Sequence, residues 1–390
     1  MNVRILNKKN TEKEKILIAF IIGSLNIGGT EKHLLNLINN FDKKKFSIHL
    51  HLLNEKGTMF SKMNKEVKVY YPKKTISTKF SHCINFFKTL IRIKLTKPDI
   101  IHCFLPQSYI FGGIIGLLLN HKNVIMSRRS LNAYQRKYKI IPLRKIEEFL
   151  HKYSKIILAN SKAVYSELIE EGVKKEKLKL IYNGVILRKE KKVNIRNIKK
   201  KLGLKSNRYF IFSSIANLIP YKNQIIIIKA AEKLLRITNK FIIIFVGSGT
   251  VEYTNFLKME ITKRKLNKNI LLLKQTVDVD KYFYISDVGI SSSLEEGFSN
   301  TILEYLNFGK PVIATNVGGN VDVINKKNGI LIESNNHQQM FEAMKSMIIN
   351  KKDLKKFKDG AKNEVQKYCF EKMIKNYKNV YEKSLECELY

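Results

Sequence analysis

The sequence predicts two doubly wound α/β domains in tandem. Short apolar runs typical of buried parallel strands alternate with amphipathic stretches, and this alternation occurs twice along the chain. A polar, strongly basic stretch over residues 188–203 separates the two series and predicts a linker. The length of 390 residues also favours two domains over a single core.

The N-terminal domain is expected over residues 1–187. Its first strand is predicted at 15–22, and a helix over 30–40 follows, with Thr30 available as its N-cap. Further strands are predicted at 46–53, 99–104, 123–126, 155–159 and 178–181. Repeated strand–helix units imply a parallel sheet with helices on both faces.

The C-terminal domain is expected over residues 204–370. A strand at 209–215 precedes a helix over 223–235, and more strands are predicted at 241–246, 270–273, 288–291, 311–314 and 329–332. Residues 371–390 are predicted to form a last helix, with packing against the N-terminal domain as one option. Sheets of this kind bind ligands at the carboxyl ends of their strands, so a cleft between the domains is the expected site.

The net charge of +39 is compatible with nucleic acid, an anionic membrane surface or a phosphate-bearing substrate as partner. AT-rich codon usage is a plainer explanation, and no nucleic-acid-binding signature accompanies the charge, so no nucleic-acid partner is predicted. The first 15 residues lack the apolar segment of a signal peptide, and the run Ile110–Leu119 is too short to span a bilayer. A cytoplasmic protein is expected, with peripheral contact to the inner face of the membrane as an open alternative.

A loop with two adjacent glycines, Gly28 and Gly29, joins the first strand to the next helix. Glycines let the backbone approach a ligand closely, and free amides at a helix start attract phosphate. A plain tight turn is the alternative. Because the loop lacks the Gly-x-Gly-x-x-Gly spacing, no dinucleotide cofactor is predicted.

The segment Glu296–Glu304 is the most specific candidate site. Between its two glutamates lie the residues of a predicted turn and helix start: Gly297, Phe298, Ser299 and Asn300. Eight residues correspond to about 12 Å of helix rise, which is too far for the carboxylate pair of a glycosidase. This spacing suits two hydroxyl groups of one extended ligand, with a diphosphate at the helix start between them. A capped helix with two solvated glutamates is the alternative.

Three further features carry candidate polar groups. Lys222 lies just before the helix over 223–235, where an ammonium group can neutralise a leaving phosphate. His102 lies near a strand end, where ligands gather, and a hydrogen-bonded core histidine is equally compatible. Asp278-Val-Asp280 has the spacing of a metal-binding Asp-x-Asp motif, but no other ligand candidates lie nearby, and the four cysteines lack zinc-type spacing. Neither a metal nor a cofactor is predicted.

The stretch Lys79–Leu95 is typical of an amphipathic helix, with an apolar stripe from Phe80 to Ile91 among basic residues. The surrounding span Lys43–Lys97 holds 14 Lys or Arg against two Glu. An interfacial helix on an anionic membrane and an ordinary helix packed on the sheet both fit this pattern.

Taken in order, these pieces resemble the GT-B retaining glycosyltransferases of family 4. The loop with Gly28 and Gly29 resembles the family's glycine-rich loop, and the segment Glu296–Glu304 resembles its Glu-x7-Glu signature. Other segments resemble the family's donor-phosphate motif and flanking stretches: Asn160–Lys162, Tyr182–Val185, Ala216–Asn223 and Pro311–Gly319. The resemblance extends from about residue 15 to about residue 332.

The resemblance implies two Rossmann-like domains that face a central cleft, and it implies roles for individual residues. Glu296 would contact the donor sugar, Glu304 the ribose hydroxyls, Lys222 the diphosphate, and His102 the region of the reacting sugar. The other groups at the diphosphate would be Gly28, Gly29 and the amides near Phe298, Ser299 and Asn300. Such enzymes generally need no metal.

The resulting hypothesis is sugar transfer from a UDP- or GDP-sugar to a glycan or lipid-linked acceptor in bacterial surface polysaccharide synthesis. A sugar-nucleotide epimerase of the same fold and a basic nucleic-acid-binding protein are the alternatives. The chain departs from the family pattern at one point, because Asn217 and Ile219 stand where an Arg usually precedes the phosphate Lys. Arg128 and Arg129, after a strand end, are candidates to supply the missing charge.

Overall fold

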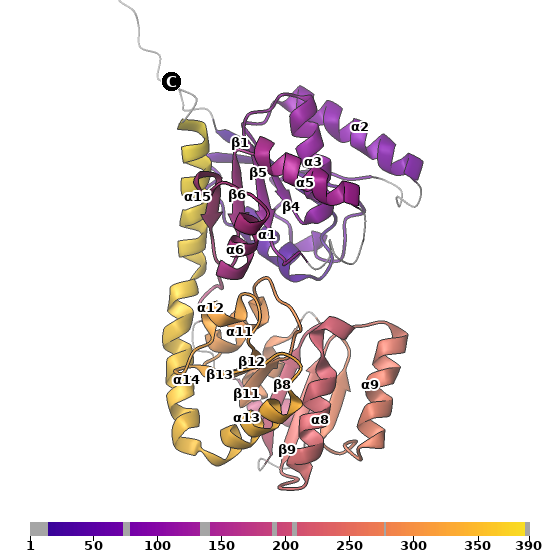
Figure 1. Cartoon of the computed structure of the whole chain (residues 1–390), viewed down its shortest axis with the longest axis vertical. Coiled ribbons are helices and arrows are strands. Elements are labelled where there is room, and N and C mark those ends of the chain that lie inside the picture. Colours follow the sequence, from indigo (N-terminus) through magenta and orange to yellow (C-terminus); the bar gives the residue numbers. More distant parts are fainter. Residues whose placement is uncertain are drawn as a thin grey trace, which may run out of the picture.

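The computed structural model describes residues 15–72, 79–132, 141–188, 193–204, 209–276 and 278–386. These residues form two α/β domains, each built on its own parallel sheet, and Figure 1 shows them one above the other. The doubly wound fold class predicted from the sequence is therefore confirmed. The predicted linker, residues 188–203, includes a short helix, α7 (Ile195–Lys201), while residues 189–192 lie outside the described part.

The N-terminal domain has seven parallel strands in the order β3-β2-β1-β4-β5-β6-β7. The strands are β1 (Ile16–Ile22), β2 (Phe46–Leu52), β3 (Lys68–Tyr70), β4 (Ile100–Phe104), β5 (Val124–Arg128), β6 (Ile156–Ala159) and β7 (Leu178–Leu180). The helices are α1 (Gly29–Asn39), α2 (Lys79–Thr96), α3 (Pro106–Leu118), α5 (Ile141–Tyr153) and α6 (Lys162–Glu170). Strand β3 was not predicted, although β7, an equally short strand at the other edge of the sheet, was.

The C-terminal domain has six parallel strands in the order β10-β9-β8-β11-β12-β13. The strands are β8 (Phe210–Ile215), β9 (Phe241–Val246), β10 (Ile270–Leu273), β11 (Val288–Ser291), β12 (Val312–Thr315) and β13 (Gly329–Ile332). The helices are α8 (Gln224–Leu235), α9 (Val251–Lys263), α10 (Asp280–Ile285), α11 (Asn300–Asn307), α12 (Asn320–Val323), α13 (His337–Ile349) and α14 (Lys351–Val365).

Each sheet reverses its strand order once, next to its first strand. The reversal lies between β1 and β4 in the first sheet and between β8 and β11 in the second. A crevice opens at the carboxyl ends of the strands beside such a reversal. The two crevices face each other, because residues that follow strands of both sheets line one cleft between the domains.

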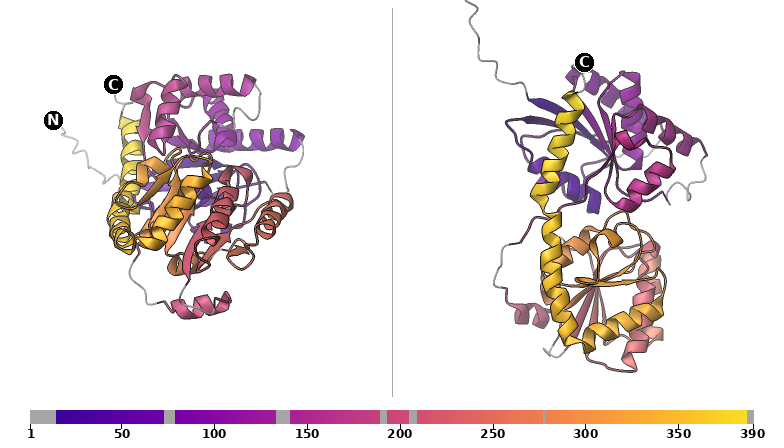
Figure 2. Two further views of the ribbon diagram at one scale, coloured as in Figure 1. Left: turned by 60° about the horizontal axis from the view of Figure 1, so that its bottom comes forward. Right: turned by 60° about the vertical axis from the view of Figure 1, so that its left-hand side comes forward.

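The last helix, α15 (Phe370–Glu386), belongs in space to the N-terminal domain. Figure 2 shows it leaving α14 and running along the side of the other domain. Its buried side chains join the core of the first sheet: Phe370, Met373, Ile374, Tyr377 and Tyr381. The tyrosine rings pack among aromatic side chains of β1, α1 and β4, so the two domains are connected twice.

Helix α2 packs on the sheet with one face only. Ile93 is buried, and Phe86 and Leu90 pack against the same core. The opposite face exposes four large apolar side chains: Ile84, Phe87, Ile91 and Leu95. The predicted stripe is thus largely the outward face, although the side chain of Phe80 lies outside the described part. In the ranges that the structure describes, no helix is both long and apolar enough to cross a bilayer.

Candidate active site

A cleft of about 560 Å³ lies between the two domains. Its N-terminal wall contains residues that follow β1, β4 and β5, and its C-terminal wall contains residues that follow β8, β9 and β11. Of the predicted site residues, all but His102 line it: Gly28, Gly29, Lys222, Glu296, Gly297, Phe298, Ser299, Asn300 and Glu304. The fold therefore brings segments from both halves of the chain into one volume.

Lys222 and Glu296 form an ion pair in the C-terminal wall, with 2.5 Å between Nζ and Oε2. Both side chains are largely buried, and Ser293 donates a second hydrogen bond to the same carboxylate oxygen. Burial opposes the charge on the ammonium group, but Glu296 and its neighbours outweigh burial and raise the pKa of Lys222. A fixed, protonated lysine is suited to hold a phosphate group.

Helix α11 starts in the cleft and carries the second glutamate. Ser299 caps the helix by accepting a hydrogen bond from the amide of Ile302. Glu304 lies a little more than one turn further on and forms an ion pair with Lys32 of α1. The carboxylate predicted for the ribose is thus held by a lysine of the opposite domain, which a ribose would have to displace.

The two walls touch at the start of α11. The side chain of Asn300 donates to the carbonyl oxygen of Gly29 at 2.9 Å and accepts from Asn183 at 2.5 Å. Gly297 also packs against the other domain, since a Cβ atom at this position would lie 2.3 Å from the carbonyl oxygen of Arg129. The glycine of the signature is therefore needed for a backbone contact between the domains.

The structure does not bring His102 to the cleft. Its side chain is fully buried, and its ring nitrogens lie 2.7 Å from the hydroxyl groups of Ser127 and Tyr381. Burial is the main reason that the pKa of His102 falls well below its usual value. Of the two interpretations left open by the sequence, the geometry favours the hydrogen-bonded core histidine.

The buried histidines of the N-terminal domain should make the protein sensitive to acid. Burial lowers the pKa values of His33 and His102 well below 6.5 and that of His51 to about 3. These imidazole rings stay neutral in the folded state, whereas in the unfolded state they take up protons as the pH falls. Their contribution to stability is therefore complete above the pKa of a histidine in the unfolded chain and is lost below it. Each such histidine lowers the free energy of unfolding by about 1.4 kcal/mol for each pH unit below about 6.5.

Urea unfolding should therefore show a free energy of unfolding about 4 kcal/mol lower at pH 5.5 than at pH 7.5. In a His51→Gln variant, the difference in the free energy of unfolding between the two pH values should be about a third smaller. Equal stability of the wild type at both pH values would contradict the buried, neutral state of these rings.

The Asp-x-Asp motif is engaged in ion pairs outside the cleft lining. Asp280 pairs with Arg188 at 2.6 Å, and Asp278 lies 3.6 Å from the ammonium group of Lys281. Within the described ranges, no three His, Cys, Asp or Glu side chains gather as a metal site would require. The two aspartates thus have electrostatic partners that explain their presence.

The cleft also contains Arg129, one of the two candidates for the missing charge, and four residues that were not predicted for the site. Glu31, Lys32, Arg129, Asn160 and Asn183 all line its N-terminal wall. Asn160 follows the end of β6, so a search of every strand end would have found it. The pairing of Lys32 with Glu304 gives no signal in the sequence, because it depends on how the domains dock.

Two family models match consecutive parts of the chain. The model described as Glycosyltransferase Family 4 matches residues 27–189, and the one described as Glycosyl transferases group 1 matches residues 194–364. The chain belongs to the GT-B glycosyltransferases of family 4. The matched segments contain every residue of the cleft named above.

This glycosyltransferase matches the following relatives over most of its own length and most of theirs. It is 28% identical over 343 residues to the UDP-Gal:alpha-D-GlcNAc-diphosphoundecaprenol alpha-1,3-galactosyltransferase of Escherichia coli, with 85% of this chain and 87% of the relative covered. It is 24% identical to the N-acetylgalactosamine-N,N'-diacetylbacillosaminyl-diphospho-undecaprenol 4-alpha-N-acetylgalactosaminyltransferase of Campylobacter jejuni, with 90% and 95% covered. Among solved structures, Anabaena Alr3699/HepE in complex with UDP-glucose is similar, with a TM-score of 0.83 at 19% identity and 94% and 99% covered.

Proposed function

We propose that this glycosyltransferase moves a hexosyl group, with retention of configuration, from a UDP-sugar to a lipid-linked glycan in bacterial surface polysaccharide synthesis. The observation that carries the proposal is the cleft, where the Lys222–Glu296 pair and the start of α11 face the Gly28–Gly29 loop. A GDP-sugar is the other donor compatible with the cleft. UDP is favoured because relatives and similar structures are named for UDP and UDP-sugars.

The roles follow from the positions of the side chains. Lys222 and the amides at the start of α11 hold the diphosphate, Glu296 meets the sugar, and Glu304 meets the ribose after leaving Lys32. In the reaction, the bond from the anomeric carbon to the diphosphate oxygen breaks, and the acceptor oxygen bonds to that carbon on the same face. The departing diphosphate accepts the acceptor's proton, and Lys222 stabilises its negative charge.

The lipid-linked acceptor is the second part of the proposal. Both relatives named above act on diphosphoundecaprenol-linked sugars, and both align over most of this chain. An acceptor of this kind lies at a membrane surface, on which the exposed face of α2 can rest. Lys88 and Lys94 extend from α2 beside its exposed apolar side chains, which suits an anionic bilayer at the inner face of the cell membrane.

Nucleotide release with a panel of UDP- and GDP-sugars, with and without undecaprenyl-diphosphate-linked sugars, tests the reaction. We expect one donor to release its nucleotide only when acceptor is present, equally well in EDTA, and to give a product of unchanged anomeric configuration by NMR. Conversion of the donor sugar without acceptor would instead identify an epimerase. No turnover with any donor and acceptor pair, or an inverted product, would contradict the proposal.

The membrane contact makes a separate prediction. Phe87 and Leu95 are 59% and 76% exposed on α2, so the double variant Phe87→Ser, Leu95→Ser should weaken binding to vesicles containing phosphatidylglycerol. We expect a loss of ten-fold or more, because each large apolar side chain contributes about 1.5–3 kcal/mol when fully buried. Co-sedimentation with vesicles measures the effect.

Matched apolar residues on the other domain provide the control. Val251 and Met259 of α9 are 78% and 65% exposed, and the variant Val251→Ser, Met259→Ser should bind vesicles like the wild type. If both double variants lose vesicle binding equally, the effect is not specific to α2 and the proposed contact is wrong.

A further inference from the structure

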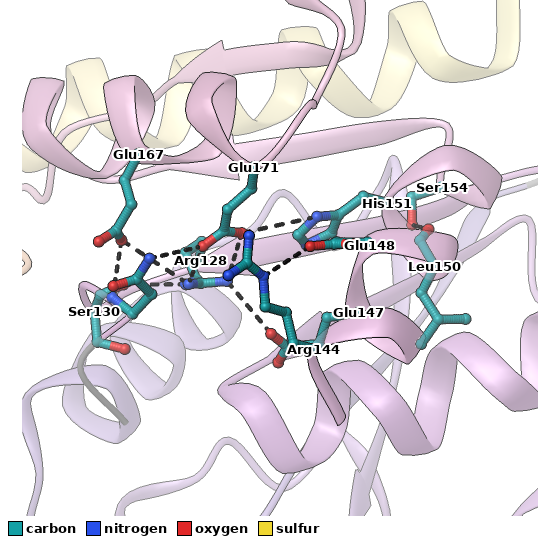
Figure 3. Close-up of polar contacts among 11 residues, drawn as sticks. Arg128, Ser130, Arg144, Glu147, Glu148, Leu150, His151, Ser154, Glu167 and Glu171 are labelled. Carbon is teal, nitrogen blue, oxygen red and sulfur yellow. Dashed lines mark hydrogen bonds and ion pairs between the residues drawn. The ribbon is translucent and has the colours of Figure 1, made fainter. Parts of the chain in front are cut away.

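Two consecutive arginines at the end of β5 have opposite electrostatic environments. The guanidinium group of Arg128 lies 3.0, 3.8 and 3.9 Å from carboxylate oxygens of Glu171, Glu147 and Glu167. Figure 3 shows these three glutamates around Arg128, with His151 beside Glu171. Successive side chains of a strand point to opposite sides, so the next residue leaves this cluster. Arg128 is thus fully compensated by charges of its own domain.

Arg129 lacks such direct contacts with carboxylates, although Glu31 in the same wall acts on it from beyond ion-pair distance. It is 8% exposed, and no ion pair joins it to a carboxylate of the described residues. Its Nη2 donates to Asn183 Oδ1 at 2.7 Å, and its Nη1 lies 3.3 Å from the ring of His33 and 3.4 Å from the hydroxyl of Tyr377. These partners are uncharged, because burial keeps His33 neutral by lowering its pKa and also keeps the Tyr377 hydroxyl protonated by raising its pKa. The Nε of Arg129 has no hydrogen-bond partner at all.

A buried cation that no carboxylate contacts directly is costly, which suggests a role for Arg129 in ligand binding. Arg129 lines the cleft, and its partner Asn183 in turn contacts Asn300, the first residue of α11. It is therefore one side chain away from the helix start at which a diphosphate is proposed to bind. Lys222 and Lys32 differ, since they already pair with Glu296 and Glu304, and Lys62, which also lines the cleft, is exposed to solvent.

We infer that Arg129 is a phosphate-binding residue, which donates hydrogen bonds from the N-terminal wall to a diphosphate at the start of α11. An arginine can donate two parallel hydrogen bonds to phosphate oxygens, whereas the asparagines around it offer no charge. Tyr377 positions the guanidinium group, so α15 of the C-terminal segment supports the site from behind. This inference rests on the proposed function, and it assigns the cation that Asn217, on the opposite wall, does not supply.

Either the donor nucleotide or a lipid-linked acceptor can provide the diphosphate. Binding of UDP and of farnesyl diphosphate to wild type, Arg129→Met and Arg129→Lys separates the two sources, with uridine and farnesol as phosphate-free controls. If the donor is the source, the Kd of UDP should rise about 10–100-fold in Arg129→Met while uridine binding is unchanged. If the acceptor is the source, farnesyl diphosphate should show this loss while UDP binding is retained. Arg129→Lys, which keeps a point charge, should lose less.

The ligand-free melting temperature distinguishes a binding role from a structural role. Arg129→Met removes a buried charge that no carboxylate contacts directly, so its melting temperature should stay within a few degrees of the wild type or rise. Should Arg129→Met fold poorly, Arg129→Lys still reports on binding. The inference is overturned if both diphosphates bind the Arg129 variants as tightly as the wild type. That result leaves the proposed function intact, whereas failure of the wild type to bind either nucleotide diphosphate, UDP or GDP, contradicts the proposed function itself.

Discussion

Replacing Lys222 with methionine is expected to lower kcat/KM for the donor by about 10²–10³-fold, which is typical for the loss of one preorganised charge at a leaving group. Lys222 is held in a largely buried ion pair with Glu296, so its ammonium group is in place before the diphosphate develops charge. A steady-state assay of nucleotide release measures the loss. Lys222→Arg keeps the charge and should recover part of the activity.

A matched pair of variants separates phosphate binding from sugar binding. Lys222→Met should also weaken UDP binding, whereas Glu296→Gln should lose comparable turnover but bind UDP like the wild type, because its proposed contact is the sugar. Lys233→Met, at a hydrogen-bonded lysine of α8 outside the cleft lining, should leave both properties unchanged. Turnover of Lys222→Met within three-fold of the wild type would show that Lys222 has no role at the leaving group.

Replacing Tyr381 with alanine is expected to destabilise the N-terminal domain by about 3–5 kcal/mol, as for other large aromatic truncations in a core. The ring is fully buried between Phe20, Phe41 and Phe46, and its hydroxyl lies 2.7 Å from Nδ1 of His102. The variant removes this packing although Tyr381 lies far along the chain from the domain that it stabilises. Urea unfolding measures the change.

Two controls divide this effect into its parts. Tyr381→Phe removes only the hydroxyl and should cost about 1–3 kcal/mol, because a buried histidine nitrogen loses its partner. Lys375→Ala, on the exposed face of α15, should change stability by no more than about 0.5 kcal/mol. Wild-type stability of Tyr381→Ala would mean that α15 does not form part of the N-terminal core.

Most of the fold could be predicted because its signals are local. Buried parallel strands such as β1, β8 and β9 are short apolar runs, and their positions agree with the structure to within a residue or two. The cleft could be predicted too, because the loop at Gly28 and the turn at Glu296 both follow the ends of strands. Strand β3 was not predicted, whereas the equally short edge strand β7 was.

The sequence by itself determined the two domains, the linker region and the candidate segments, because strand and helix periods and turn residues act over a few neighbouring positions. Only the tertiary structure decided which partners those segments meet. His102 is a core residue because Tyr381, 279 residues further along the chain, reaches it from α15. Likewise, Glu304 pairs with Lys32, which lies 272 residues earlier in the chain. The two arginines at the end of β5 differ for the same reason: Glu147 of α5, Glu167 of α6 and Glu171 just after α6 surround Arg128, while Arg129 faces the cleft with no carboxylate in direct contact. Such contacts form when distant segments dock, and no local pattern encodes them.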